Sequence, residues 1–158
     1  PEPRPYYWNG SRGTWRARES SNKGYGRHCE VAVSAYGLGK PQWTPTKGDS
    51  PPWMQLGFAL YEAFSAAISK EDQLHEVFPS ASYTMLRSHS VKLQIDVSGF
   101  SPGPRDMLDA YVAAATVREY ECGAGCRVGG GDGLGTITLP RPLPKGPAEV
   151  LTWPAKNV

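Results

Sequence analysis

Two aspartates, Asp106 and Asp109, are the residues best suited to chemistry, because they stand three positions apart. At that spacing both side chains lie on one face of a helix. Two neighbouring carboxylates can bind a hard divalent cation such as Mg²⁺ through oxygen. Acidic residues also suit the first turn of a helix, where negative charge interacts favourably with the helix dipole. The pair alone therefore leaves a metal site and a purely structural role open.

A third carboxylate, Glu76, lies in the segment Gln73–Pro79, whose alternating side chains predict a strand. Leu74 and Phe78 share its face, which predicts burial, and a buried carboxylate is costly unless it is paired or bound to a cation. The alternative places Glu76 at the exposed end of the strand. Arg27 and Glu30 are likewise three positions apart, which by itself is compatible with a simple surface ion pair.

The first 28 residues carry six Lys and Arg side chains against two Glu, although the net charge of the whole chain is only +2. Arg12, Arg16 and Arg18 are interleaved there with aromatic residues. Phosphates pair with such cations and nucleic-acid bases stack on the rings, which makes this arm a candidate nucleic-acid-binding segment. The alternative is a solvated, glycine-rich arm that its aromatic side chains hold to the core.

The chain has three cysteines, Cys29, Cys122 and Cys126. An odd number of cysteines argues against a secreted domain that is stabilised by disulfide bonds. A reducing cytoplasm is the simpler interpretation. A four-ligand zinc site would need all three cysteines and His28, and free thiols are the favoured alternative. No apolar run approaches the roughly 18 residues that span a bilayer, so no membrane segment is expected.

The elements that must position these residues predict one mixed α/β domain, since 158 residues give room for a single core. The predicted helix from Pro51 to about Lys70 has Ser50 as its N-cap. Its apolar residues predict burial in the core: Trp53, Leu56, Leu60 and Phe64. Other expected elements are a helix or strand over 28–35, a short helix over 80–87, a strand over 91–97, a helix over 105–122, a flexible loop over 129–131 and a strand over 136–139.

The chain divides into three predicted parts: a basic and aromatic arm or loop over 1–26, a central part over 27–142, and a Pro-rich, peripheral tail over 143–158. The first 27 residues show neither helical nor strand period. The chain begins with Pro1 rather than Met, which predicts a trimmed product or a piece of a longer protein.

Four segments in order resemble the domain-of-unknown-function family four hundred and twenty-nine, whose members are predicted nucleases of the ribonuclease H-like superfamily. These segments are Arg27-His-Cys-Glu30, Glu76-Val-Phe-Pro79, Asp106-Met-Leu-Asp109-Ala110 with the small residues that follow, and Gly133-Leu-Gly-Thr-Ile-Thr-Leu-Pro140. The resemblance covers roughly residues 27–142 and implies a ribonuclease H-like mixed sheet flanked by helices.

The resemblance also implies a role for each matched carboxylate. Asp109, Asp106 and Glu76 would be catalytic ligands of Mg²⁺ or Mn²⁺, with Arg27 and Glu30 as a supporting pair. In such nucleases two ions activate a water molecule and stabilise the leaving oxygen of a phosphodiester. The family pattern opens with strands that carry two further aspartates, and these are not found before Arg27. Either the chain is a piece that has lost these strands, or its first residues are replaced by something different. In both cases the fold is expected to be incomplete at its N-terminus, and so is a two-metal site.

Two functions of different classes follow from these patterns. The first is a metal-dependent nuclease-like domain that acts on phosphodiesters. The second is a non-catalytic module on the same scaffold that binds a nucleic acid or a partner protein through the basic and aromatic arm. Catalysis needs at least three convergent carboxylates and binding does not, so the positions of Glu76, Asp106 and Asp109, predicted here to converge, discriminate between them.

Overall fold

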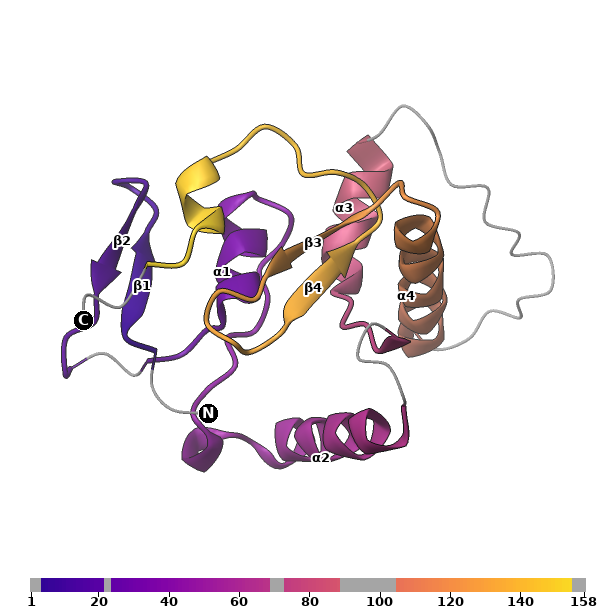
Figure 1. Cartoon of the computed structure of the whole chain (residues 1–158), viewed down its shortest axis with the longest axis horizontal. Helices are drawn as coiled ribbons and strands as arrows, with labels where there is room; N and C mark the ends of the chain where they lie inside the picture. The colour runs from indigo at the N-terminus through magenta and orange to yellow at the C-terminus, as the bar shows by residue number, and fades with distance from the viewer. Residues whose placement is uncertain (1–3, 22–23, 69–72, 89–104, 155–158) are drawn as a thin grey trace.

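The chain folds as a mixed α/β protein in which one short hairpin lies among the helices and a second lies at one edge of the molecule (Figure 1). This computed structural model describes residues 4–21, 24–68, 73–88 and 105–154. In these ranges the α-helices are α1 (His28–Ala35), α2 (Pro52–Ala67), α3 (Pro79–Ser88) and α4 (Arg105–Glu121). The strands β1 (Tyr6–Asn9) and β2 (Thr14–Ala17) form one antiparallel pair, and β3 (Cys126–Gly129) and β4 (Thr136–Leu139) form another.

The core lies where α1 packs against the β3–β4 hairpin, in the middle of the molecule (Figure 1). Gly129 ends β3 at a positive φ of 96°, and a Cβ atom there would overlap Cys29 of α1. Glycine is therefore what lets the helix and the strand approach closely. The buried apolar side chains of this core are Cys29, Ala32, Val33, Leu38, Ala81, Met85, Val128, Ile137, Leu139 and Val150.

The predicted arm is not without regular structure, because residues 6–17 form the β1–β2 hairpin. The prediction that residues 1–26 form only an arm or loop was wrong for this part of the chain. The strands have only four residues each, so a period of two has little length in which to show itself. The segment 28–35, which the sequence leaves open between helix and strand, is the helix α1.

The helix predicted from Pro51 is confirmed as α2, but its predicted burial is wrong. Ser50 is not its cap: its hydroxyl donates to the Thr46 carbonyl oxygen instead, and Pro51 occupies the N-cap position. The predicted core residues of this helix are exposed: Trp53, Leu56, Leu60 and Phe64. Helical periodicity shows which side of a helix is apolar, and it does not show whether another element covers that side.

The predicted helices over 80–87 and 105–122 are confirmed as α3 and α4, and Gly123 follows α4 with a positive φ of 79°. The strand predicted over 73–79 is reduced to an isolated parallel bridge between Val77 and Thr138, because α3 begins at Pro79. The strand predicted over 91–97 lies outside the described residues. The loop predicted over 129–131 begins one residue later than expected, because Gly129 belongs to strand β3.

The prediction that the C-terminal segment is peripheral was wrong. A short 3₁₀ helix, Ala148–Leu151, buries Val150 completely, and Arg141 before it is also buried. Trp153 packs against aromatic rings of the β1–β2 hairpin. In the part of the chain that the structure describes, no helix combines the length and apolar character needed to cross a membrane.

Candidate functional site

The turn between β1 and β2 is set by the side chain of Asn9. Its Oδ1 accepts hydrogen bonds from the Ser11 hydroxyl at 2.8 Å and from the Arg12 backbone N–H at 3.1 Å. Asn favours turns because its short side chain replaces a backbone acceptor in this way. Gly13 completes the turn with a positive φ of 61°, which glycine adopts at no steric cost. The turn leaves Arg12 exposed at the tip of the hairpin.

One face of the hairpin anchors it to the rest of the molecule. Trp8 and Trp15 are cross-strand partners whose rings meet edge to face with centroids 5.5 Å apart. Trp15 also lies 4.9 Å from Trp153 and 5.7 Å from His28, measured between ring centroids. Its indole N–H donates to the Glu149 carbonyl oxygen at 3.2 Å. These aromatic residues hold the hairpin on α1 and on the C-terminal segment.

The other face of the hairpin carries Tyr7, Arg16 and Arg18, which we call the hairpin stripe. Tyr7 lies directly opposite Arg16 in the β-sheet register, and residues directly opposite one another share a face. Arg18 follows Arg16 by two positions, and because side chains alternate along a strand it lies on the same face. The fold therefore brings two of the three predicted nucleic-acid-binding arginines together with an aromatic ring.

Backbone carbonyl groups hold Arg18 in place. Its Nε donates to the Arg4 carbonyl oxygen and its Nη2 to the Tyr6 carbonyl oxygen, the latter at 3.1 Å. Burial lowers the pKa of Arg18, and the charge of Arg4 lowers it further, yet an arginine stays protonated in proteins. Among residues 4–21, 24–68, 73–88 and 105–154, no carboxylate lies within ion-pair distance of Arg12, Arg16 or Arg18.

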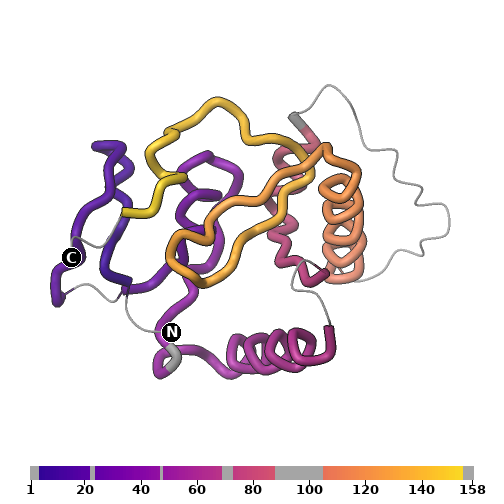
Figure 2. The backbone as a smooth tube through the Cα atoms, in the orientation of Figure 1, coloured from indigo at the N-terminus to yellow at the C-terminus, as the bar shows by residue number. Residues whose placement is uncertain are grey.

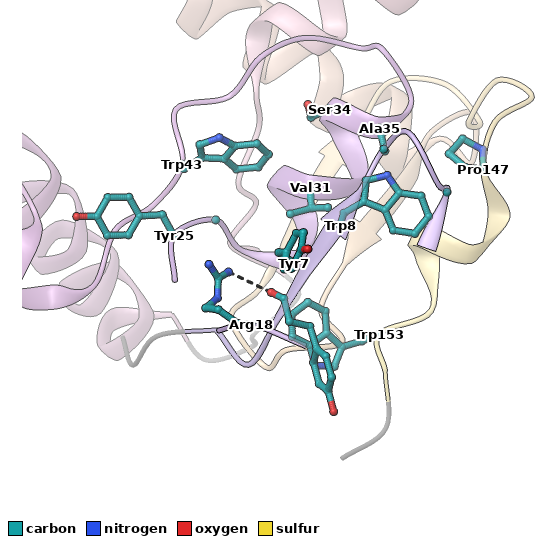
Figure 3. A pocket seen from close by; sticks show the side chains of 14 residues that line it. Tyr7, Trp8, Arg18, Tyr25, Val31, Ser34, Ala35, Trp43, Pro147 and Trp153 are labelled. Atoms are coloured by element: carbon teal, nitrogen blue, oxygen red, sulfur yellow. Dashed lines mark hydrogen bonds between the residues drawn. The ribbon is translucent and has the colours of Figure 1, made fainter. Parts of the chain in front are cut away.

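A cavity of about 550 Å³ lies beside this stripe. Figure 3 shows the guanidinium end of Arg18 pointing into a space bordered by Tyr7, Tyr25 and Trp43, with Val31 of α1 behind it. Tyr7 and Trp43 are 37% and 42% exposed, which is enough for a planar ligand to stack on either ring. The cavity thus places one half-buried cation, Arg18, beside several aromatic side chains.

Trp43 reaches this cavity because Gly26 has no side chain. A Cβ atom on Gly26 would lie 2.7 Å from the indole ring, and Gly26 has a φ of +90° that favours glycine. The Gly26 backbone N–H donates to the Thr44 carbonyl oxygen at 3.0 Å. Sequence reasoning missed Trp43 and Trp153, since both lie outside the basic arm. The signal available in the sequence was the position of Trp43 in a Gly- and Pro-rich segment, where a large side chain is easily left exposed.

Arg27, Glu30 and Glu76 form one ion-pair network. Arg27 Nε donates to Glu30 at 2.9 Å, and its two terminal nitrogens donate to the two carboxylate oxygens of Glu76, one of them at 2.7 Å. Glu30 also accepts from the Thr44 backbone N–H and hydroxyl. Burial alone would lower the pKa of Arg27, but Glu76 and Glu30 raise it well above its usual value.

The network fixes three segments that are distant in sequence. Glu30 accepts a hydrogen bond from the Arg27 backbone N–H at 2.9 Å, which completes a capping box at the start of α1. Glu76 ties this helix end to the segment before α3. The predicted surface ion pair of Arg27 and Glu30 is therefore a largely buried pair, and it includes the carboxylate that was predicted as a third metal ligand.

Asp106 and Asp109 both lie in the first two turns of α4, as the sequence predicts. Asp106 is exposed, whereas Asp109 Oδ1 accepts a hydrogen bond from the Tyr83 hydroxyl of α3 at 2.9 Å. Within the described residues, no three His, Cys, Asp or Glu side chains gather as a metal ion would require. The structure thus does not bring Glu76 together with the two aspartates.

The four residues of the alternative zinc site have other surroundings. His28 uses one ring nitrogen with the Val150 carbonyl oxygen at 2.8 Å and the other with the Gly131 backbone N–H at 3.0 Å. Cys29, Cys122 and Cys126 are free thiols, buried, exposed and half-buried respectively. The structure therefore does not bring these four described residues together as a group of metal ligands.

Comparisons with protein-family models, curated proteins and solved structures give no match. Any indication of function must therefore come from the geometry of this chain. That geometry offers a cationic and aromatic surface on the hairpin, an ion-pair network at the start of α1, and two aspartates on α4.

Proposed function

We propose that this protein is a non-catalytic module that binds single-stranded nucleic acid on the hairpin stripe and in the adjoining cavity. The observation that carries the proposal has two parts. Arg12, Arg16 and Arg18 have no carboxylate partner among the described residues, and Arg16 and Arg18 lie on one face of the hairpin with the partly exposed ring of Tyr7. Phosphates would replace the missing anions, and bases would stack on Tyr7 and Trp43.

The proposed ligand is a single strand because the aromatic rings line a cavity. Bases inside a duplex are stacked on one another and cannot enter such a space, whereas an unpaired base can. Each base stacked on an aromatic side chain contributes about 1–3 kcal/mol, largely independent of base type. We therefore expect binding with little sequence preference.

The decisive experiment measures the binding of a labelled oligothymidylate by fluorescence polarisation at several salt concentrations. The variant Arg12→Ser with Arg16→Ser should weaken binding and lower the slope of log K against log salt by about 1.4, since each phosphate contact on a single strand contributes about 0.7. The matched control replaces two exposed cations elsewhere, Lys40→Ser with Arg105→Ser. An equal loss of affinity in both double variants would contradict the proposal.

The metal-dependent nuclease activity stays a prediction of the family resemblance, and so does the ribonuclease H-like form of the α/β fold. Support for that fold comes from the parallel bridge between Val77 and Thr138, which adds a parallel partner to the β3–β4 hairpin. Adding Mg²⁺ or Mn²⁺ to the same binding mixture tests the activity: cleavage that Asp109→Asn abolishes would support it. Intact oligonucleotide would favour the non-catalytic module.

A further inference from the structure

Helix α2 exposes an apolar surface that no element among the described residues covers. Its 16 residues contain a single charged side chain, Glu62. Figure 2 shows α2 running along one side of the molecule, apart from the β1–β2 hairpin. Its exposed large side chains, with their exposed fractions, are Trp53 (59%), Leu56 (60%), Leu60 (47%), Tyr61 (49%) and Phe64 (55%).

The spacing of these residues defines a stripe along the helix. Trp53, Leu56, Leu60 and Phe64 are three or four positions apart and face solvent together. From their exposed fractions, the solvent-exposed area of these four side chains and Tyr61 together is roughly 500 Å². A typical monomer exposes no apolar patch larger than about 300–600 Å², and such a patch is often functional.

The neighbouring side of α2 forms one wall of a groove of about 850 Å³. Met54, Phe58 and Tyr61 line it from the helix, and Phe78 and Ile137 line it from the opposite side. The solvent-facing stripe and this groove are adjacent, so one bound segment can contact both.

The charges at the groove give it an excess of negative charge. Arg27 pairs with both Glu30 and Glu76, so one guanidinium faces two carboxylates. Glu62 of α2 adds a third carboxylate to the groove lining. The side chain of Glu76 remains 35% exposed, and an incoming cation can therefore reach it.

We propose that α2 and this groove bind a segment of another protein that presents large apolar side chains flanked by lysine or arginine. Charge complementarity selects such a partner over a second copy of this chain, because a copy would bring its own Glu62 to the acidic groove. The area agrees with this choice: roughly 500 Å² on each side matches a transient interface, whereas obligate homodimers bury about 2,000 Å² or more in total.

The test uses a synthetic helical peptide of leucines and lysines, matched in length to α2, and a twin with glutamate in place of lysine. Binding to the full chain is measured by the fluorescence anisotropy of the labelled peptides. The lysine peptide should bind at least about tenfold more tightly than its acidic twin. Leu56→Ser with Leu60→Ser should weaken its binding about tenfold or more, because the apolar area that the two leucines would bury against the peptide is lost. Leu151→Ser, an exposed leucine outside α2, should change nothing.

Charge reversal provides a test that leaves the apolar surface intact. Glu62→Lys should weaken the lysine peptide and strengthen its acidic twin, each about threefold, as for a surface ion pair. Equal binding of the two peptides, or an unchanged affinity in the double leucine variant, would overturn the proposal. A stable dimer at micromolar concentration in sedimentation analysis, lost in the double leucine variant, would overturn it too by assigning the surface to a second copy.

Discussion

Replacing Arg27 with methionine removes the cation that forms ion pairs with both Glu30 and Glu76 while keeping most of the side-chain volume. The side chain of Glu30 is only 3% exposed, and it would keep its hydrogen bonds from the backbone N–H of Arg27 and from Thr44 but lose its counter-charge. Leaving one buried partner of an ion pair uncompensated costs about 3–5 kcal/mol. We therefore expect Arg27→Met to lower the free energy of unfolding by that amount.

The matched variant Glu76→Gln separates the two halves of the network. Glu76 is partly exposed, so solvent screens its interaction with Arg27, and we expect a loss of only about 1 kcal/mol. Urea unfolding at pH 7, followed by tryptophan fluorescence, measures both variants. Arg27→Met combined with Glu30→Gln should recover part of the loss, because the buried charge is then absent. A loss below about 1 kcal/mol for Arg27→Met, or a larger loss for Glu76→Gln, would refute this account of the network.

Three further predictions follow. Leu60→Ala should change the free energy of unfolding by less than about 0.5 kcal/mol in urea titrations, because Leu60 is half exposed; a loss above about 2 kcal/mol would mean that α2 is buried. Alkylation at pH 8 should modify Cys122 well before Cys29 in mass spectra, because burial raises the pKa of Cys29 to about 12; equal rates would contradict this. The Arg141 hydrogen bond lowers the pKa of Glu119 from its usual 4.5. The stability that this carboxylate contributes is therefore present above pH 4.5 and is lost as pH falls through the lowered pKa. The urea midpoints of wild type and Glu119→Gln should differ at pH 7 and converge as pH falls below 4.5, and a constant difference would refute the linkage.

Helix prediction from the sequence succeeds for α2, α3 and α4 because local spacing and end signals determine a helix. Burial is a property of tertiary packing, and for that reason the apolar residues of α2, Leu60 among them, are placed wrongly by their spacing alone. The hairpin of β1 and β2 was missed for a related reason. Its strands are short, and the contacts that stabilise it, from Trp15 to Trp153, join residues far apart in the sequence.

The candidate site shows the same division. The charge excess and aromatic content of the first residues are visible in the sequence, and they indicate Arg16 and Arg18 as candidate binding residues, which the fold places on one face of the hairpin. The sequence does not show that Tyr7 lies opposite Arg16, because that depends on the strand register. It also does not show that Arg27 engages Glu76, since a pairing over 49 positions depends on the fold.

Photo-crosslinking tests directly whether a single nucleic-acid strand binds on the hairpin stripe and in its cavity. An oligonucleotide containing 4-thiothymidine is irradiated with the full chain, and mass spectrometry identifies the linked residues. We expect links at Tyr7, Tyr25 or Trp43, with the yield falling as salt rises because phosphate contacts are lost. Links confined to α4 or to the groove beside α2, or a yield insensitive to salt, would contradict it.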